Sequence, residues 1–481
     1  MPSTILSLTA ALAFSLNYAS SFASPAPSHT VPASPLSACA ASLNAQLPSP
    51  TPPNFHFSGN VRRFYVAAEE ELWDYAPTGW DNWLGVPFNL SPRAQNVGNV
   101  QYGQTWLKAL YRGYTDATFT ERSEQPPWQG TQGPTLRAEV GDLIEIMFVN
   151  NLSKNYATMH SMGLQYSKYS EGADYPNNTM PDVNVVLPEA EAVPPIDHGV
   201  APGGCVVYKW MVSDIAGPNF GEPARTHSYH SYVALQEDTN AGLIGPTIIY
   251  APGQMNQTMA TYREFPLLYM IYDESSSWLS GENAAVLQNS GSWEQEHSHH
   301  GPQKAWHDAP SEGGRNDHHY GVRNQSEGIG EGALGLDSTQ TLWSGNQSVW
   351  LPQLVNLQGS GQFMGAPSFH TLNGYVFANN PPYEMCFNDN AIWYINGYGS
   401  ASHVFHMHGN SFVYNNASEY AISINDGVGK TLYMSASGVG LWQVLCHVNN
   451  HQSNGMLNNY RVYKPGQCPL PPLAPAPNAV V

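Results

Sequence analysis

The stretch that decides the fold and the chemistry of this chain is residues 446–456, which read Cys-His-Val-Asn-Asn-His-Gln-Ser-Asn-Gly-Met. About forty residues earlier the chain reads His403-Val-Phe-His-Met-His-Gly409. A blue-copper (type 1) site takes two imidazoles and a thiolate, with a weak thioether as the axial ligand. The spacing Cys–x4–His–x4–Met supplies three of these donors from one loop between strands, and an upstream strand supplies the second imidazole. The sequence therefore predicts a type 1 copper site formed by His403, Cys446, His451 and Met456.

Three more histidines accompany this set. His406 and His408 alternate along a predicted strand, so both imidazoles are expected on one face of it. His447 follows Cys446 directly and is expected to point to the opposite side. These positions would connect the blue-copper site to a second metal cluster through a very short covalent path.

The composition predicts an all-β protein. Gly and Pro are abundant, at 43 and 38 residues, and aromatic residues make up 12% of the chain, which is typical of many strands joined by turns. Residues 143–149 and 392–395 have the apolar, β-branched and aromatic character of buried strands. A length of 481 residues fits two large β domains, expected at residues 54–250 and 262–468 with residues 251–261 as the linker.

Several longer runs resemble one known family. Trp73-Asp-Tyr75, Gly133-Pro134 with Gly141-Asp142, and Gly242-Leu-Ile-Gly-Pro246 resemble landmarks of the first domain of the multicopper oxidases. Asp273-Glu-Ser-Ser-Ser-Trp278 resembles a landmark of their second domain. The resemblance covers about residues 60–468 and is to the ceruloplasmin–hephaestin branch, to which clotting-factor A domains are also related. It implies two cupredoxin-like Greek-key β-barrel or sandwich domains in tandem.

The resemblance also implies four histidine motifs, and three of their eight ligand positions hold other residues. In the family these motifs bind a trinuclear copper cluster that reduces dioxygen to water. Here Met162, Tyr232 and Leu445 stand where the family has histidine. Ser231 stands where Cys446 stands in the second domain, and a hydroxyl cannot replace a copper thiolate, so no type 1 site is expected in the first domain.

Five cluster histidines remain, and the losses are uneven. The resemblance implies that His160 and His406 hold a type 2 copper, and that His230, His408 and His447 are what is left of the type 3 pair. One or two copper ions are therefore expected at a residual interdomain site, in addition to the blue copper. No catalytic residue is expected beyond the metal ligands.

The cysteine count fits an oxidising compartment. Five cysteines minus Cys446 leave an even four. The resemblance implies a disulfide between Cys386 and Cys468. Elimination then leaves Cys39 and Cys205 as a second pair, and free buried thiols are the alternative.

The N-terminal residues 1–23 predict a secretory signal peptide, with a disordered tail as the alternative. Residues 24–53 and 469–481 are rich in Pro and small residues and are expected to be flexible. No later segment is apolar for long enough to span a bilayer. Seven Asn-x-Ser/Thr sites favour a secreted glycoprotein. They are Asn89, Asn151, Asn177, Asn256, Asn324, Asn346 and Asn416.

Two further features bear on partners. A net charge of −19 excludes nucleic acid as an expected partner and leaves no polybasic patch for a membrane, although it could attract cationic substrates. A histidine-rich loop at about 294–320 reads either as a metal-capturing segment or as a solvated insertion. A third interpretation is that it supplies ligands in place of those absent at 162, 232 and 445.

Taken together, these features predict a secreted copper-dependent oxidoreductase. It would carry out one-electron oxidation of a phenol, another small organic molecule or a metal ion, with dioxygen as the acceptor. A homotrimer is one arrangement that the resemblance allows, because two-domain relatives build the cluster between subunits. The alternatives are a blue-copper electron carrier and a non-catalytic paralogue that has lost oxygen reduction.

Overall fold

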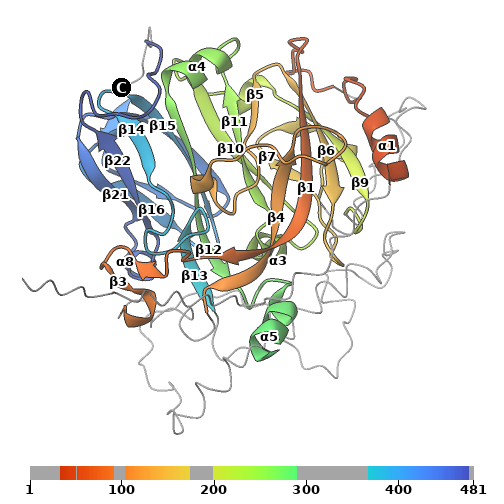
Figure 1. The fold of residues 1–481 in the computed structure, drawn as a ribbon. Coiled ribbons are helices and arrows are strands. Elements are labelled where there is room, and N and C mark those ends of the chain that lie inside the picture. Colours follow the sequence, from red (N-terminus) through yellow and green to blue (C-terminus); the bar gives the residue numbers. More distant parts are fainter. Residues whose placement is uncertain (1–32, 50, 92–102, 174–198, 290–366, 476–481) are drawn as a thin grey trace, which may run out of the picture.

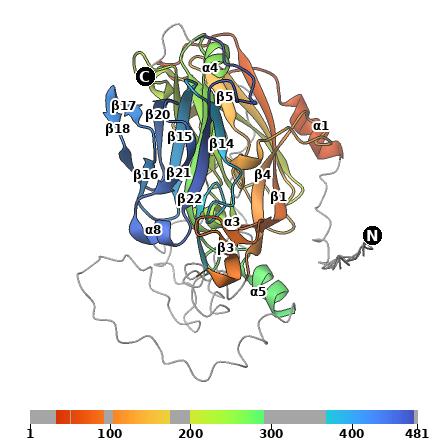
Figure 2. The same ribbon diagram turned by 60° about the vertical axis from the view of Figure 1, so that its left-hand side comes forward.

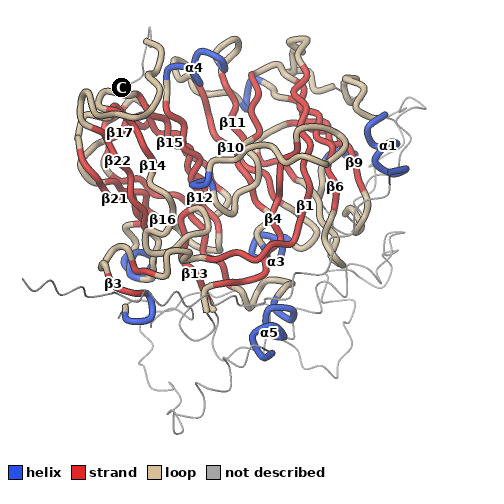
Figure 3. Tube along the Cα trace, in the orientation of Figure 1, coloured by secondary structure: helices blue, strands red, loops and turns tan. Residues whose placement is uncertain are grey.

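The computed structural model describes residues 33–49, 51–91, 103–173, 199–289 and 367–475. Figure 3 shows that strands dominate these residues and that helices are few and short. They form two β domains in tandem, each built from two sheets; the second domain lies at the left of Figure 1, with β12 in green and its later strands in cyan and blue. The predicted all-β, two-domain architecture is confirmed.

Domain 1 pairs a five-stranded sheet with a four-stranded sheet, and two further short strands form a hairpin. The first sheet has the order β4-β1-β6-β9-β8, and the second has the order β5-β11-β10-β7. The strands are β1 (Val61–Asp74), β2 (Trp80–Asp81), β3 (Val86–Pro87), β4 (Thr105–Tyr114), β5 (Leu136–Glu139), β6 (Leu143–Asn150), β7 (His160–Met162), β8 (Gln165–Tyr166), β9 (Cys205–Met211), β10 (Ala224–His230) and β11 (Ile244–Tyr250).

Domain 2 pairs a six-stranded sheet with a five-stranded sheet. Their orders are β13-β12-β15-β20-β17-β18 and β14-β22-β21-β16-β19. The strands are β12 (Arg263–Asp273), β13 (Ser368–Leu372), β14 (Tyr383–Cys386), β15 (Asn390–Tyr398), β16 (His403–Met407), β17 (Phe412–Tyr414), β18 (Ala417–Glu419), β19 (Ala421–Ile424), β20 (Val428–Ser435), β21 (Gly440–Cys446) and β22 (Leu457–Tyr463).

The helices lie at the margins of these sheets. The α-helices are α1 (Ala33–Ala41), α3 (Leu235–Ala241), α4 (Met255–Thr261), α5 (Ser280–Asn289) and α8 (Asn449–Ser453), and the 3-10 turns are η1 (Phe88–Leu90), η3 (Pro127–Gln129), η4 (Lys168–Ser170) and η6 (Asp214–Ala216). Helix α4 lies within the predicted interdomain linker. Among the described residues, no helix combines the length and the apolar character needed to cross a bilayer.

The two domains repeat one strand-pairing pattern. In domain 1, β1 pairs parallel with β6, and β6 pairs antiparallel with β9. In domain 2, β12 pairs parallel with β15, and β15 pairs antiparallel with β20. Every residue of β6 is buried, as are eight of the nine residues of β15, because each strand lies inside its sheet and faces a core on one side and a neighbouring layer on the other. The strands predicted from residues 143–149 and 392–395 are therefore confirmed, and β7 and β16, which begin at His160 and His403, occupy equivalent places.

The domains pack tightly on each other through β10 and β20. The Thr226 N–H donates to Thr431 Oγ1 at 2.9 Å, and the Tyr433 hydroxyl donates to the Ala224 carbonyl at 2.8 Å. A second interdomain core joins Trp106 and Ile244 of domain 1 to Tyr272 and other apolar side chains of domain 2. Because the six-stranded sheet of domain 2 faces domain 1, the sheet that carries β16 and β21 forms the far side of the molecule (Figures 1 and 2).

The described parts of the two segments that composition predicted to be flexible are held against the domains. Residues 33–41 form α1, and Cys39 is tied to Cys205 by a disulfide. The Ala45 N–H donates to Glu145 at 2.7 Å. At the other end, the Ala474 N–H donates to the Ala260 carbonyl at 2.9 Å. The composition of these segments carries no signal for either attachment, because both depend on distant parts of the chain.

Candidate copper centre

Four donors predicted for a type 1 site lie in or beside one core of domain 2. β16 begins at His403, β21 ends at Cys446, α8 carries His451, and Met456 immediately precedes β22. His403, Cys446 and Met456 are fully buried, and His451 is 6% exposed. The described residues contain a His403–Cys446–His451 group whose ligand atoms all lie within 4.8 Å of one another.

The spacing of these atoms suits one copper ion. The Cys446 Sγ lies 3.5 Å from His451 Nδ1 and 3.9 Å from His403 Nδ1. Nitrogen and sulfur ligands that each stand about 2.0–2.3 Å from a single ion are separated from one another by roughly 3.5 Å. The three strong donors are therefore already at a separation that a metal ion would require.

Hydrogen bonding prepares the imidazole of His403 for a metal. Its Nε2–H donates to the Tyr398 carbonyl at 2.9 Å, which leaves the Nδ1 lone pair facing Cys446. Burial lowers the pKa of His403 to about 4, and burial also lowers the pKa of His451. Both rings are consequently neutral near pH 7, which is the form that binds metal.

In the metal-free protein, burial favours the protonated form of the Cys446 thiol. Burial raises its pKa, and the Val404 N–H, which donates to Sγ at 3.4 Å, partly offsets that effect. A coordinated thiol loses its proton to the metal's charge.

The loop that carries these ligands closes on itself through the backbone. The Met456 N–H donates to the His451 carbonyl at 3.0 Å, and the Cys446 N–H donates to the Met456 carbonyl at 3.0 Å. Met456 packs in the same apolar core as Cys446. This arrangement places the thioether-bearing residue beside the other donors, as the Cys–x4–His–x4–Met spacing predicts.

One histidine near this centre, His370, was not predicted from the sequence. The ring centre of His370, on β13, lies 5.1 Å from that of His451. Its Nδ1 is buried, with no hydrogen-bond partner among the described residues. Burial and the two neighbouring imidazoles lower its pKa to about 3. His370 stands alone in its strand, so no spacing signal could have linked it to residues 33 and 81 positions further along the chain.

A second group of histidines occupies the opposite face of β16. The His406 ring centre is 5.2 Å from that of His408 and 5.3 Å from that of His447. His408 and His447 are exposed, whereas Cys446 is buried, so the predicted alternation of sides is confirmed. His406 Nδ1 is held by the Tyr420 carbonyl at 2.7 Å.

Leu445, which stands where the family has a ligand histidine, lies next to His406 in the sheet register but faces an apolar patch. It is 1% exposed and packs with Ala378, Leu457 and Trp83. Trp83 comes from the loop between β2 and β3 of domain 1, which reaches α8 in Figure 1. The position is therefore filled by hydrocarbon and offers no donor.

The third group lies in domain 1. The ring centres of His160 and His230 are 5.5 Å apart, and the two residues are directly paired across β7 and β10. His160 Nδ1 lies 2.7 Å from the Glu171 carbonyl, and His230 Nδ1 lies 2.9 Å from the Ser231 carbonyl. Burial lowers the pKa of both, that of His230 to about 4. Tyr232 contacts both rings, and Met162 lies two residues beyond His160 on β7.

The five cluster histidines predicted from the resemblance thus divide into two sets. Within the described part of the chain, no ring contact joins His160 or His230 to His406, His408 or His447. The first pair belongs to the domain 1 sheet that faces domain 2, and the other three lie on the far side of domain 2. The blue-site donors come together in one chain, but the residual cluster does not.

The described residues include both predicted disulfides and some of the predicted glycosylation sites. Both expected disulfides form, Cys39–Cys205 and Cys386–Cys468. Asn256 and Asn416 are exposed, and Asn151 is half-buried. Asn177, Asn324, Asn346 and the histidine-rich loop lie outside the described residues, and the surroundings of the Asn89 side chain are not described.

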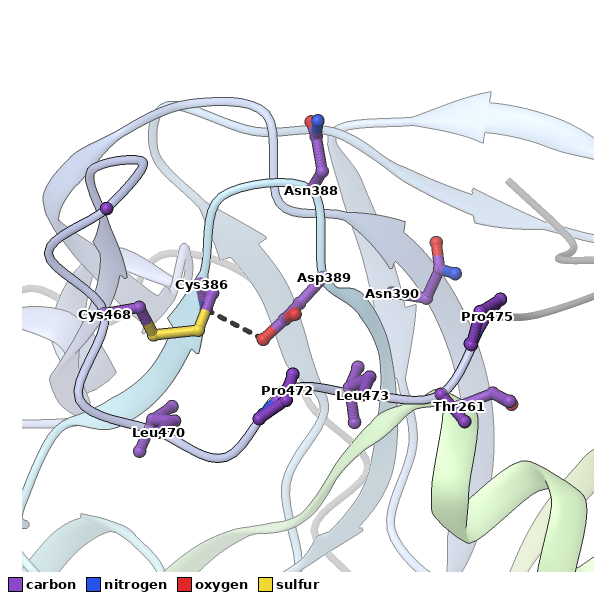
Figure 4. Close-up of a pocket in the computed structure, with 12 residues that line it drawn as sticks. Thr261, Cys386, Asn388, Asp389, Asn390, Cys468, Leu470, Pro472, Leu473 and Pro475 are labelled. Atoms are coloured by element: carbon purple, nitrogen blue, oxygen red, sulfur yellow. Dashed lines mark hydrogen bonds between the residues drawn. A yellow bond between two sulfur atoms is a disulfide. The ribbon is translucent and has the colours of Figure 1, made fainter.

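A cavity of about 620 Å³ lies beside the Cys386–Cys468 disulfide, between the turn at residues 388–390 and the C-terminal segment (Figure 4). The Asp389 carboxylate accepts hydrogen bonds there from the Cys386 N–H at 2.8 Å and from Arg263 Nε at 2.9 Å. The C-terminal segment and α8 lie at opposite ends of domain 2, so this cavity is remote from the copper donors (Figures 1 and 2).

Comparison with known proteins agrees with this geometry. Residues 350–466 match the family model described as multicopper oxidase. The chain is 28% identical over 412 residues to ferroxidase HEPHL1 of Homo sapiens, an alignment that covers 84% of this chain and 29% of the relative. It is 26% identical over 416 residues to ceruloplasmin of Homo sapiens, covering 84% and 32%.

Among solved structures, the blue copper oxidase from Nitrosomonas europaea is similar at a TM-score of 0.44 and 15% identity, covering 84% of this chain and 86% of that one. The chain spans about a third of the length of the curated relatives quoted above. The matched domain, these relatives and the assembled His403–Cys446–His451 donors lead to one conclusion. The chain is related to the multicopper oxidases, with ferroxidase HEPHL1 and ceruloplasmin among the proteins that it resembles over most of its length.

Proposed function

We propose that this protein is a copper-dependent oxidoreductase that takes electrons one at a time at His403, Cys446, His451 and Met456. The observation that carries the proposal is the buried donor group, whose atoms are already at copper-binding separations. A copper ion held by such donors supplies reversible one-electron chemistry. The tethered imidazole of His403 and the closed 446–456 loop restrain the donors and so favour electron transfer without large rearrangement.

The electron-entry side is expected at α8. His451 is the least buried of the three strong donors, and its neighbours Asn449 and Asn450 are exposed. A phenol, another small organic molecule or a metal ion could approach there. The negative charge of the chain favours a cationic substrate by long-range attraction.

The electron-exit side is the opposite face of β21. Cys446 is buried and His447 is exposed, so one peptide unit connects the inner donor to the outer His406–His408–His447 group. Dioxygen is the proposed acceptor. Because the domain 1 histidines lie elsewhere in the same chain, an oxygen-reducing site would require domain 1 of a second chain, which a ring-shaped homotrimer would supply.

Secretion completes the proposal. The N-terminal segment has the pattern of a signal peptide, and both disulfides suit an oxidising compartment. Nucleic acid is not a proposed partner because of the net charge of −19.

A blue-copper electron carrier is the second candidate, and Leu445 favours it. Hydrocarbon fills that position, and Met162 and Tyr232 replace two further family ligands, so the complete trinuclear set cannot form even between chains. An electron carrier needs the blue site alone.

Copper reconstitution separates these candidates. The oxidoreductase proposal expects a blue absorption band, more than one copper per chain, and substrate-dependent oxygen uptake that Cys446→Ser abolishes. Light scattering before and after reconstitution tests the homotrimer. His227→Gln is a matched control, because His227 Nε2 is bonded to the Ala216 carbonyl at 2.7 Å and the residue lies outside all three groups. A blue band without oxygen uptake would leave the electron carrier, and a colourless protein would refute both.

A further inference from the structure

Domain 1 contains a triangle of rings built by His160, His230 and Tyr232. The ring centre of Tyr232 lies 5.3 Å from that of His160 and 5.9 Å from that of His230, and the two imidazoles are 5.5 Å apart. In the blue site of the same chain, the imidazoles of His403 and His451 are 5.1 Å apart. The domain 1 rings therefore have nearly the spacing of the two imidazoles in the proposed blue site.

The two imidazoles are held in a ligand-ready orientation. Each has Nδ1 beside a backbone carbonyl, that of Glu171 for His160 and that of Ser231 for His230. A donor hydrogen bond at Nδ1 fixes the tautomer in which Nε2 carries the lone pair. In His227 the other ring nitrogen is used: Nε2 donates to the Ala216 carbonyl, and Nδ1 lies beside the backbone of Gly163. It is a structural histidine three residues away.

Tyr232 is the third ring of the triangle. Its N–H donates to Thr158 Oγ1 at 2.9 Å, which fixes the backbone next to His230. Within the described part of the chain its hydroxyl makes no hydrogen bond, and the side chain is only partly buried. Among the described ring contacts of these two imidazoles, Tyr166 contacts His160 and Tyr398 contacts His230, whereas Tyr232 contacts both.

His230 also contacts a tyrosine ring from domain 2, that of Tyr398. The Tyr398 ring lies 6.0 Å from it, and the Tyr398 hydroxyl is hydrogen-bonded to Ser228 Oγ at 2.7 Å. The same Tyr398 residue accepts the His403 Nε2–H through its carbonyl. The domain 1 triangle is thus supported by the strand end that orients a blue-site ligand.

We propose that His160, His230 and Tyr232 form a mononuclear site for divalent copper, with two imidazoles and one phenolate as ligands, complete within a single chain. Mixed nitrogen and oxygen donors suit Cu(II). Formation of the copper–oxygen bond breaks the O–H bond of Tyr232 and releases that proton to solvent, without any change of oxidation state. The inference rests on the proposed function for the choice of copper, and it makes Tyr232 a replacement ligand where the family has histidine.

The test uses the full chain in a Cys446→Ser background, where the blue band is absent. Addition of Cu(II) is expected to produce a visible phenolate-to-copper absorption band and an electron paramagnetic resonance signal typical of nitrogen and oxygen ligation. Tyr232→Phe is expected to abolish the band and weaken the copper affinity of this site about tenfold or more, since the loss of even a supporting group around a metal costs 10–100-fold.

A matched variant controls for packing. Tyr166→Phe removes the hydroxyl of a ring that contacts His160 and is expected to keep the band. An unchanged spectrum in Tyr232→Phe, or copper bound without a phenolate band, would overturn the inference. Failure of the proposed function looks different, because the wild-type chain would then lack the blue band or show no substrate-dependent oxygen uptake, whatever Tyr232 does.

Discussion

At the scale of one residue, a single hydrogen bond to each histidine sets which ring nitrogen is free to bind a metal, as His403 shows. The Tyr398 carbonyl holds Nε2 and leaves Nδ1 for metal, whereas at His160, His230 and His406 a carbonyl lies beside Nδ1. The choice of ring nitrogen therefore differs between the blue site and the other two groups. At each histidine one backbone carbonyl occupies one ring nitrogen, and the other nitrogen is left to bind a metal.

Met456→Leu tests the axial position of the blue site. Met456 is fully buried, and a volume-conserving change to Leu is expected to cost less than about 1.5 kcal/mol of stability. Loss of the weak thioether donor should disfavour Cu(II) more than Cu(I) and raise the reduction potential, while the blue colour remains. Spectroelectrochemical titration checks this, and an unchanged or lowered potential would exclude Met456 as a ligand.

His227→Gln tests the pH dependence of stability in the metal-free protein. Burial lowers the pKa of His227 to about 4, below the value near 6.5 of an unfolded chain. Between these values the unfolded chain binds the extra proton, so this stabilising contribution is complete above pH 6.5 and is lost as the pH falls toward 4. The wild-type advantage over His227→Gln should shrink by about 2 kcal/mol between pH 6.5 and pH 5, at about 1.4 kcal/mol per unit.

Denaturant unfolding of both proteins across this range measures the difference directly. The comparison with the variant is needed because burial raises the pKa of Asp238 to about 6, which gives a contribution of opposite sign in the same window. An advantage that does not change with pH would show that His227 is protonated in the folded state.

At the scale of elements, the β2–β3 loop of domain 1 decides what the far face of domain 2 can bind. Trp83 of this loop packs with Leu445 of β21 and Leu457 of β22. His406, directly across from Leu445 in the register, stays accessible on the same sheet. Leu445 is therefore buried and its neighbour His406 accessible, because Trp83, more than three hundred residues earlier in the chain, covers only Leu445.

Leu445→His tests whether the missing ligand can be restored. The imidazole would enter an apolar patch, and burial of an unpaired polar group is expected to cost about 1–3 kcal/mol in the metal-free protein. Thermal and denaturant unfolding measure the loss. His408→Leu, at an exposed position just after β16, is the control and should stay within about 0.5 kcal/mol of the wild type. Full stability of Leu445→His would show that the Trp83 loop moves aside.

At the scale of the whole molecule, a buried ion pair joins the two domains. Lys108 of β4 donates to Glu274, just after β12, at 2.7 Å, and to the Asn240 carbonyl at 2.6 Å. Both side chains are fully buried. Tyr75 also donates to Glu274, and the Lys108 ammonium lies 4.2 Å from the centre of the Tyr272 ring. The interface is therefore specified by a matched polar group inside an aromatic core.

Glu274→Gln should destabilise the protein by about 3–5 kcal/mol, because it leaves the Lys108 charge buried without its counter-ion. The double variant Lys108→Met with Glu274→Leu removes both charges and is expected to be more stable than the single variant. Chemical denaturation of the three proteins measures these differences. A single variant as stable as the wild type would mean that water reaches the interface.

The sequence by itself predicted the class of fold and the donor group of the proposed blue site. Cys446, His451 and Met456 are within eleven residues of one another, so local spacing around one loop brings them together. Alternation along the strand likewise predicted that the imidazoles of His406 and His408 share one face. These are properties of one loop and one strand, which repeat at fixed periods.

Only the tertiary structure decided which distant residues share a site. His370 approaches His451 through the pairing of β13 with β12, Trp83 covers Leu445 from another domain, and Tyr232 meets His160 because β10 pairs with β7. Sheet register and domain packing set these contacts, and neither is written in the spacing of a single segment. The separation of the five residual histidines into two sets has the same origin, because the packing of two whole domains places them on different sheets.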